Sequence, residues 1–299
     1  MKRKYIIAAL GCSVLCAPLA AAVPGGSPVV PQVGVVQCAD RSLRVLYGLP
    51  LNLFYGPVVG ASDGRAAFAD DIGLLADARG ITLVSTDGVS LGSLQVNAFA
   101  AVLGVAPAPP PPNAAAASLA GRLAAWLPAL ASIAAWNGVG FTLVPVDSFP
   151  GAVQAITPLS NSAAALLISL PGGGVVRNVV SLQNGQVLSS TLAGSAALSM
   201  YERAGFTLSL GAHGLSVSDA AGHIQAFPVV DPYIAIDSIA DLVVVIRSPR
   251  ANSSWVLALD DAALVRGALR LSVLPGPAAA KPARVLPAAG LAPGPRGVR

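Results

Sequence analysis

Short apolar runs, each followed by a turn and a second apolar run, recur along most of the chain. Such runs, bounded by Gly, Pro, Asn or Asp, are typical of antiparallel β-strands joined by tight turns. The Asn137-Gly138 pair between two of the runs is a strong hairpin signal. The pattern predicts six β-hairpins: 43–47 with 51–59, 72–76 with 80–85, 131–136 with 140–144, 164–170 with 175–182, 197–201 with 206–210, and 242–247 with 254–259.

The hairpins resemble one another at a regular spacing. Gly64-Arg65 and Gly121-Arg122 each open a stretch that reaches Thr-Leu-Val, at 82–84 and 142–144. Hairpins start about 30 to 60 residues apart, which fits four-stranded blades of roughly 40 to 50 residues. One short sheet cannot bury its apolar faces alone, whereas stacked neighbours can. We therefore expect an all-β fold, a β-propeller of about five to seven four-stranded blades. A pair of β-sandwich domains is the alternative, and the echo between the two stretches argues against it.

Three segments break the strand pattern and divide the chain. Residues 23–31 form a Pro/Gly linker, and 275–299 form a Pro/Ala/Gly-rich tail without acidic residues. Residues 105–118, with five prolines, are expected to run as an extended loop inside the repeat domain. The repeat domain itself is expected to span 32–274. The sandwich alternative would place a domain boundary near the proline-rich loop.

The first 22 residues have the features of a secretory signal peptide. A basic segment (2–4) precedes an apolar core (5–15), and Ala20 and Ala22 supply the small residues at −3 and −1. Cleavage after Ala22 would send the protein to the periplasm or the extracellular space. Cys12 weakly resembles a lipoprotein site, so lipidation is a second possibility for this segment.

A long uncharged run, 123–146, raises the question of a membrane span. A spanning helix needs about 20 consecutive apolar residues. Pro128, Pro145 and the Asn137-Gly138 turn interrupt the run, which fits two strands better than one helix. We therefore predict no integral membrane span.

The stretch from residue 62 to 88 resembles a known family. Ser62-Asp63-Gly64-Arg65, followed by Ala-Phe-Ala (67–69), Ile-Thr-Leu-Val (81–84) and Asp-Gly (87–88), is similar to one blade of the exported bacterial propellers of the YVTN and TolB-like type. Those families have a Ser-Pro-Asp-Gly turn at the start of the blade, and this chain has no proline before Asp63. The resemblance covers about one blade and implies a fold rather than an activity, because propellers carry binding modules and hydrolases alike.

The charge distribution argues against a nucleic-acid partner. Three of the 18 Lys and Arg residues lie in the leader and four lie in the tail, so the rest of the chain holds fewer basic than acidic residues (14). A nucleic-acid-binding domain is expected to carry its basic residues on the folded surface.

One serine motif suggests hydrolase chemistry. Residues 60–64 match G-x-S-x-G with Ser62 at its centre, and Asp147 or Asp219 followed by His223 would give a Ser–Asp–His order. That nucleophile requires a strand-to-helix turn, but strands are expected after Ser62. We therefore favour a blade turn for this motif.

Metal-binding candidates are few. The pairs Asp70-Asp71 and Asp260-Asp261 could bind calcium or act as acid and base, although a solvated turn is the favoured explanation for adjacent carboxylates. His213 and His223 are both flanked by glycine and would need distant carboxylates to form a site. Glu202 is expected in a turn.

No cofactor is expected, because Gly172-Gly173-Gly174 lacks the following Lys-Ser/Thr and helix of a phosphate loop. Cys38, the cysteine that remains after leader removal, is expected to be a buried spare thiol.

The sequence favours a non-enzymatic scaffold that binds a protein or small ligand at the blade loops. The alternative is a propeller-type lactonase or hydrolase with a carboxylate-lined central site.

Overall fold

The computed structural model describes residues 31–49, 52–106, 119–194, 197–203, 205–211, 214–228, 235–240, 242–248 and 253–274. For β16 and most of β20 the backbone alone is described. These residues belong to one compact unit that begins at Pro31. The expected signal peptide, most of the linker, the core of the proline-rich loop and the tail lie outside the described residues.

Antiparallel sheets make up nearly all of the described chain, and each sheet is built from consecutive strands. We call them blades 1 to 6. Blade 1 has three strands and each of the other five has four. Blade 1 contains β1 (Gln32–Gln37), β2 (Ser42–Leu49) and β3 (Asn52–Ala61). Blade 2 contains β4 (Arg65–Ala69), β5 (Ile72–Ala76), β6 (Ile81–Ser85) and β7 (Ser90–Leu94), and blade 3 contains β8 (Val102–Val105), β9 (Leu123–Leu127), β10 (Ser132–Trp136) and β11 (Phe141–Pro145).

The second half of the chain repeats this plan. Blade 4 contains β12 (Ala152–Ser160), β13 (Ala163–Ser169), β14 (Val175–Ser181) and β15 (Val187–Gly194). Blade 5 contains β16 (Ala197–Arg203), β17 (Phe206–Gly211), β18 (Gly214–Asp219) and β19 (Ile224–Phe227). Blade 6 contains β20 (Ala235–Ala240), β21 (Val243–Ser248), β22 (Ser253–Ala258) and β23 (Leu271–Leu274). The short 3₁₀ helix η1 (Pro128–Leu130) joins β9 to β10, and α1 (Asp261–Val265) joins β22 to β23.

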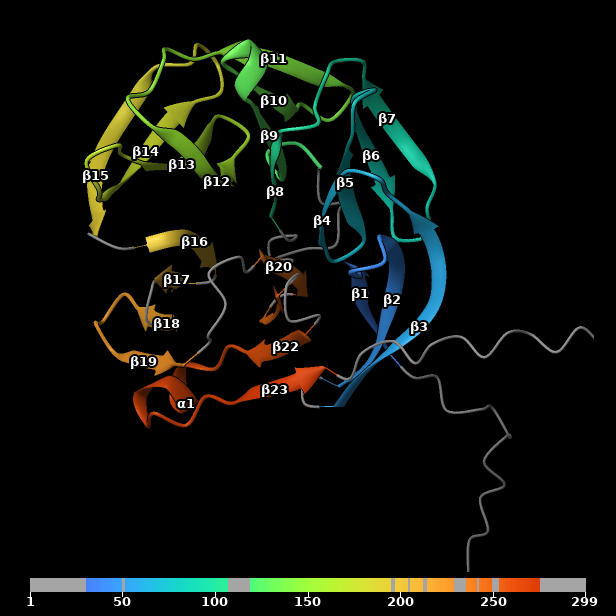
Figure 1. The fold of residues 1–299 in the computed structure, drawn as a ribbon, viewed down its shortest axis with the longest axis vertical. Helices are drawn as coiled ribbons and strands as arrows, with labels where there is room; N and C mark the ends of the chain where they lie inside the picture. The colour runs from blue at the N-terminus through green and yellow to red at the C-terminus, as the bar shows by residue number, and fades with distance from the viewer. Residues whose placement is uncertain are drawn as a thin grey trace, which may run out of the picture. The chain divides into compact units, whose positions relative to one another are not determined.

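The blades lie around a common centre, with the first strand of each four-stranded blade innermost and the last strand at the rim (Figure 1). The all-β propeller expected from the sequence is therefore confirmed. The β-sandwich alternative is wrong, because β8 and β9 flank the proline-rich loop and pair directly in one sheet, with Val105 opposite Leu123. No domain boundary can pass between two neighbouring strands of a single sheet.

All six predicted hairpins are confirmed, one in each blade: β2–β3, β5–β6, β10–β11, β13–β14, β16–β17 and β21–β22. The Asn-Gly turn shows why local sequence decides them. The side-chain oxygen of Asn137 accepts hydrogen bonds from the backbone N–H groups of Val139 and Gly140, both at 3.0 Å. Gly138 takes a positive φ of 103°, which a residue without a side chain adopts at low cost.

Two sequence expectations need correction. Val105, placed at the start of the proline-rich loop, is instead the last residue of β8 and is buried. The Gly-Arg echo is also out of phase, because Gly64-Arg65 leads into the first strand of blade 2 and Gly121-Arg122 into the second strand of blade 3. The echo therefore reflects shared strand–turn chemistry and not equivalent positions in two blades. The uncharged run 123–146 forms β9, η1, β10 and β11, and no helix in the described part is long and apolar enough to cross a membrane.

The hydrophobic core lies between neighbouring blades. Separate clusters of buried side chains join blades 1 and 2, 2 and 3, 3 and 4, 5 and 6, and 6 and 1. Between blades 4 and 5, strands β12 and β13 contact β16. Adjacent residues of a strand point to opposite faces, so in β1 Val35 packs toward blade 2 and Val36 toward blade 6. Strands packed between two blades in this way have both faces buried, which explains continuous apolar sequences such as that of β10.

Within the residues that the structure describes, blade 1 has no inner strand. The side chain of Gln37, at the end of β1, donates hydrogen bonds to the carbonyls of Ser62 and Gly64, just before β4 begins. Arg247, which pairs with Ala235 at the start of β20, donates to the carbonyl of Gln37 at 3.0 Å. Strand β1 therefore ends where β4 and β20 start and runs opposite to both. Because β4 and β20 also contact each other, blade 1 packs behind them as the three outer strands of a blade.

Candidate functional site

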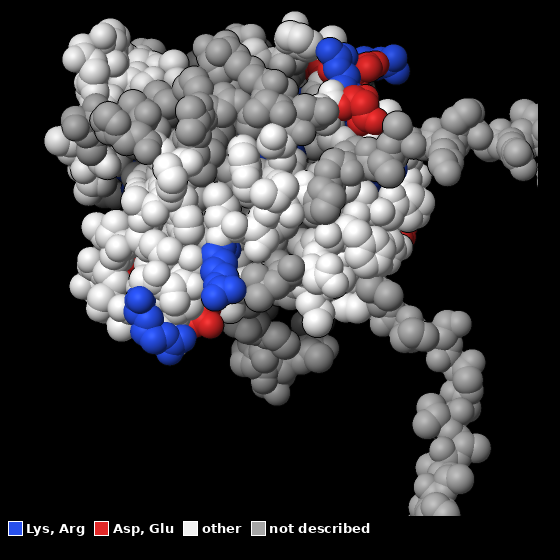
Figure 2. Space-filling model, turned by 60° about the horizontal axis from the view of Figure 1, so that its bottom comes forward, with Lys and Arg blue, Asp and Glu red and all other residues white. Residues whose placement is uncertain are grey.

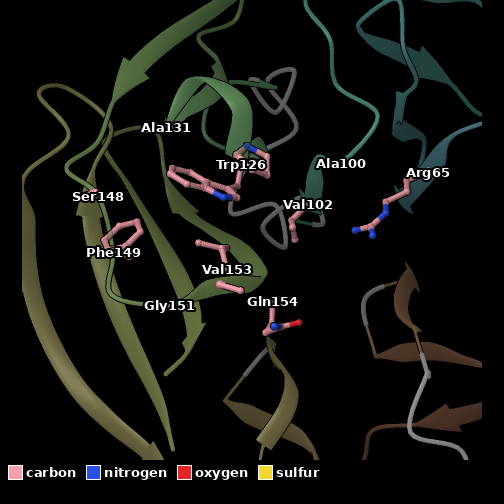
Figure 3. Close-up of a pocket in the computed structure, with 12 residues that line it drawn as sticks. Arg65, Ala100, Val102, Trp126, Ala131, Ser148, Phe149, Gly151, Val153 and Gln154 are labelled. Carbon is pink, nitrogen blue, oxygen red and sulfur yellow. The ribbon is translucent and has the colours of Figure 1, made fainter. Parts of the chain in front are cut away.

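A pocket of about 390 Å³ opens where the inner strands of blades 3 and 4 begin. Its walls come from the first residues of β8 and β12, from the β9–β10 connection and from the loop before β12. Arg65, the first residue of β4, reaches it from blade 2 (Figure 3). The pocket is lined by Arg65, Ala100, Val102, Trp126, Pro128, Ala131, Ser148, Phe149, Gly151, Ala152, Val153 and Gln154.

Small residues and an irregular turn create this space. The β9–β10 hairpin closes through η1, and Ala131 follows it in the left-handed conformation, with φ 44°. Gly151 lies so close to blade 4 that a Cβ there would approach the carbonyl oxygen of Ser169 to 1.9 Å. A larger residue at 151 would push the loop away from β13. The irregular turn at Ala131 and the missing side chain at Gly151 therefore leave the pocket open.

One wall of the pocket is aromatic. The rings of Trp126 and Phe149 have centroids 5.7 Å apart and planes at 53°. Trp126 is otherwise buried in the core between blades 3 and 4, which fixes its ring. Paired aromatic rings give a rigid apolar surface that loses little entropy when a ligand packs on it.

The charged group of the pocket, Arg65, lies on the side away from Phe149, whereas the polar Ser148 lies beside Phe149 (Figure 3). Arg65 is exposed and donates one hydrogen bond to the carbonyl of Ala101 at 3.3 Å. The Gln154 amide donates to the hydroxyl of Ser169 at 2.9 Å, which holds this side chain in place. Among the described residues that line the pocket, Arg65 carries the one formal charge and none is acidic.

The first acidic pair, Asp70-Asp71, forms the turn between β4 and β5 and faces an arginine from the next blade. Arg122, only 5% exposed, places Nη2 3.2 Å from Oδ2 of Asp70 and 3.6 Å from Oδ1 of Asp71. Its Nε donates to the carbonyl of Ala106 at 3.1 Å. The pair therefore supplies counter-ions to a buried cation between blades 2 and 3.

The second acidic pair begins a helix. Asp260 is the N-cap of α1, and its Oδ1 accepts the backbone N–H of Ala263 at 3.0 Å. Asp261 is the first helical residue, where a negative charge interacts favourably with the helix dipole. Both side chains are exposed.

The structure offers no geometry for the metal hypothesis in the part of the chain that it describes. No three His, Cys, Asp or Glu side chains there lie together in a way that could hold a metal ion. The inner strands β4, β8 and β12 contain no Asp or Glu, whereas β20 contains Asp237, whose side chain lies outside the described residues. Glu202 in β16 and His213 have side chains outside the described residues.

The Ser–Asp–His order of the sequence is not assembled into a site. Ser62 is buried between blades 1 and 2, and its carbonyl accepts from Gln37. Asp219 and His223 close the β18–β19 turn of blade 5, with 2.7 Å between Asp219 Oδ2 and His223 Nδ1. The hydrogen bond from His223 lowers the pKa of Asp219. Strand β4 follows Ser62, not the helix that a nucleophile turn requires.

Cys38 is buried at the end of β1, as expected from the sequence. Burial raises the pKa of its thiol, with the charge of Asp40 acting in the same direction. The folded protein therefore holds Cys38 as a neutral thiol, which is a poor nucleophile.

Comparisons with known proteins give remote structural likenesses. No protein-family model matches the chain, and no curated protein matches it either. Among solved structures, the chain is similar to the WD40 β-propeller domain of Doa1, with 11% identity, 76% of this chain and 78% of that chain covered, and a TM-score of 0.45. It is also similar to Hsv2 of Kluyveromyces lactis, with 12% identity, coverage of 82% and 98%, and a TM-score of 0.41. A third likeness is to PorZ, a surface component of the type-IX secretion system of Porphyromonas gingivalis, with 11% identity, 81% of this chain and 30% of that chain covered, and a TM-score of 0.42.

Likenesses of this size say nothing about function. The propeller fold of this chain rests on its own sheets, their order and the cores between them. The YVTN and TolB-like resemblance stays at the level of the fold, although its motif does fall on one blade: Ser62-Asp63-Gly64 is the turn into β4, and 81–84 lies in β6.

Sequence reasoning did not find the pocket. Arg65 stood out only as part of a blade motif, and Trp126 only as part of an uncharged run. The pocket residues come from three blades and are separated by up to 89 positions, from Arg65 to Gln154. One sequence feature could have indicated the pocket: Pro128 lies in the irregular β9–β10 turn, and the aromatic wall of the pocket lies beside this turn.

Proposed function

We propose that this protein is an exported, non-enzymatic β-propeller that serves as a binding or interaction scaffold in the cell envelope. The binding face is the end at which β4, β8 and β12 begin. The observation that carries the proposal is the pocket at this end, in which loops from three blades bring an aromatic wall and a single cation together. Concave sites that combine apolar walls with a few polar groups are typical of ligand binding.

The surface supports a protein or small-ligand partner over a nucleic acid. On the face shown in Figure 2, uncharged residues cover most of the described surface, and the basic groups lie beside acidic ones. A polyanion would meet no broad basic patch there. The lactonase or hydrolase alternative requires a carboxylate-lined centre; β4, β8 and β12 contain no Asp or Glu, and the side chains of Glu202 in β16 and Asp237 in β20 lie outside the described residues.

Export is tested by expressing the full chain in a bacterial host and measuring the mass of the periplasmic product. We expect a mature protein that begins at Val23. Ala20→Leu combined with Ala22→Leu removes the small residues at −3 and −1 and is expected to block processing. An unprocessed wild-type chain confined to the cytosol would contradict the export proposal.

The scaffold role is tested by capture from envelope extracts on the exported protein. A variant with Trp126→Phe and Phe149→Ala on the binding face should lose the captured partner, and Phe at 126 keeps the core between blades 3 and 4 largely filled. Leu188→Ala together with Leu192→Ala, two exposed residues on the rim strand β15, is the matched control and should keep it. Equal loss in both variants, or turnover of lactone substrates by the wild type, would argue against a scaffold that binds through this face.

A further inference from the structure

The pocket has a polarity that narrows the chemistry of its ligand. Figure 3 shows Arg65 on one side and Trp126 with Phe149 on the other, with Val102 between them. A ligand that fills the pocket therefore meets a cation at one end and an apolar surface at the other.

The cation favours an anionic group. Arg65 makes one hydrogen bond, to a backbone carbonyl, and among the described residues no carboxylate lines the pocket to neutralise it. A guanidinium presents its N–H groups in a planar fork that matches the two oxygens of a carboxylate. The hydrogen bond to the carbonyl of Ala101 positions the Arg65 side chain. Since the guanidinium is exposed and has several N–H groups, the others are available to a ligand.

The remaining walls favour an apolar group next to that anion. The Trp126–Phe149 pair is the largest apolar surface in the lining, and Val102 and Val153 extend it. A volume of about 390 Å³ lies within the range of small-ligand pockets and holds one large side chain with its flanking backbone. The Gln154 amide, held by Ser169, adds a polar group suited to a peptide bond.

Resting on the proposed binding role of this face, we propose that the pocket binds a carboxylate attached to an apolar or aromatic group. Two sources can present this chemistry: the C-terminal residue of an extended peptide, and a free small carboxylic acid. The shared recognition is a charge-assisted contact with Arg65 and packing on Trp126 and Phe149.

The test is an NMR titration of the full-length protein that follows the indole N–H signal of Trp126. The chain has three tryptophans, and Trp126→Phe assigns the signal by its loss. The probes are N-acetyl-phenylalanine and a short alanine peptide that ends in phenylalanine, each as the free acid and as the amide. The acids should shift the Trp126 signal, and the amides should bind on the order of tenfold more weakly, since they lack the charge-assisted hydrogen bond.

Variants separate the charge of Arg65 from other effects. Arg65→Gln should weaken binding of the acids on the order of tenfold, and Arg65→Lys should recover part of the loss. Arg79→Gln makes the same charge change in the exposed β5–β6 turn and should leave binding unchanged. Tighter binding of the peptide than of N-acetyl-phenylalanine supports a peptide ligand, and equal binding supports a small acid.

Equal binding of acids and amides, or an Arg65→Gln variant that binds as the wild type does, would overturn the proposal. Failure of every probe would overturn the ligand class as well. Neither result would touch the scaffold role, which the capture experiment tests through Trp126 and Phe149.

Discussion

Replacing Asp70 by Asn is expected to lower the free energy of unfolding by about 2 to 3 kcal/mol. The side chain of Arg122 is only 6% exposed and has Asp70 as its nearer carboxylate, at 3.2 Å. Losing one partner of a buried ion pair leaves a desolvated charge behind, which costs about 3 to 5 kcal/mol when no other partner remains. Here Asp71 stays within 3.6 Å and offsets part of the loss. Urea unfolding followed by tryptophan fluorescence measures the change.

The substitution is well matched to its position. Asp70 has a φ of 53°, and Asn tolerates this left-handed conformation as well as Asp does. Asp71→Asn is the control, because the Asp71 side chain is 74% exposed, and it should cost about 0 to 1 kcal/mol. Equal effects of the two variants would show that Arg122 is hydrated rather than buried between blades 2 and 3.

Gly121→Ala is expected to destabilise the protein by about 2 to 5 kcal/mol, for two separate reasons. Gly121 has a φ of 78°, which strains any residue with a Cβ. That Cβ would also lie 2.2 Å from the backbone nitrogen of Asn161, in the β12–β13 turn of blade 4. Backbone cannot move aside as a flexible side chain can, so blades 3 and 4 would have to separate. The same urea titration measures the effect.

Gly222→Ala measures the cost of backbone strain at a positive φ without a steric clash of the added Cβ. Gly222, in the β18–β19 turn, has a φ of 91°, and nothing lies within 4 Å of the Cβ that Ala would add. Its substitution should cost about 1 kcal/mol from strain alone. If Gly121→Ala lowered the free energy of unfolding no more than Gly222→Ala does, the result would contradict the close approach of Gly121 to Asn161.

Features of the fold that depend on neighbouring residues could be predicted from the sequence, and features that depend on contacts between distant residues could not. The hairpins were predictable because each turn depends on residues next to one another, such as Asn137 accepting from Val139 and Gly140. The position of a strand within its blade was not predictable, because strands of similar composition occupy inner, central and rim positions. Thus Gly64-Arg65 and Gly121-Arg122, alike in sequence, lead into different strands of their blades.

The candidate site depended on contacts between blades, which spacing along the chain does not encode. Asp70-Asp71 was a reasonable metal candidate by residue type, but its partner is Arg122, some 50 residues away in the next blade. Trp126 and Gln154 belong to no motif and Arg65 only to a blade motif, and only the packing of blades 2, 3 and 4 brings them to one pocket. The helix α1 was also missed, although Asp260 provides an N-cap signal.

The propeller closes through blade 1, between blades 6 and 2. In the described part of the chain blade 1 has three strands and no inner strand, yet it packs against blade 6 through Val36, Leu46 and Leu53 and against blade 2 through Val35, Leu43 and Val45. A hydrogen bond between the side chains of Tyr55 and Ser254 and another from Arg247 to Gln37 add to the seam with blade 6. We infer that blade 1 unfolds together with the rest of the propeller.

Thiol labelling of Cys38 tests this closure most directly, because Cys38 is buried at the end of β1 beside Arg247 of blade 6. With Cys12→Ser and Cys16→Ser in the full chain, it is the one thiol left among the three cysteines. We expect the labelling rate in increasing urea to give an opening free energy equal to that of global unfolding measured by tryptophan fluorescence. Rapid labelling while the fluorescence is still native would mean that blade 1 opens on its own, and would contradict a propeller closed by its three-stranded blade.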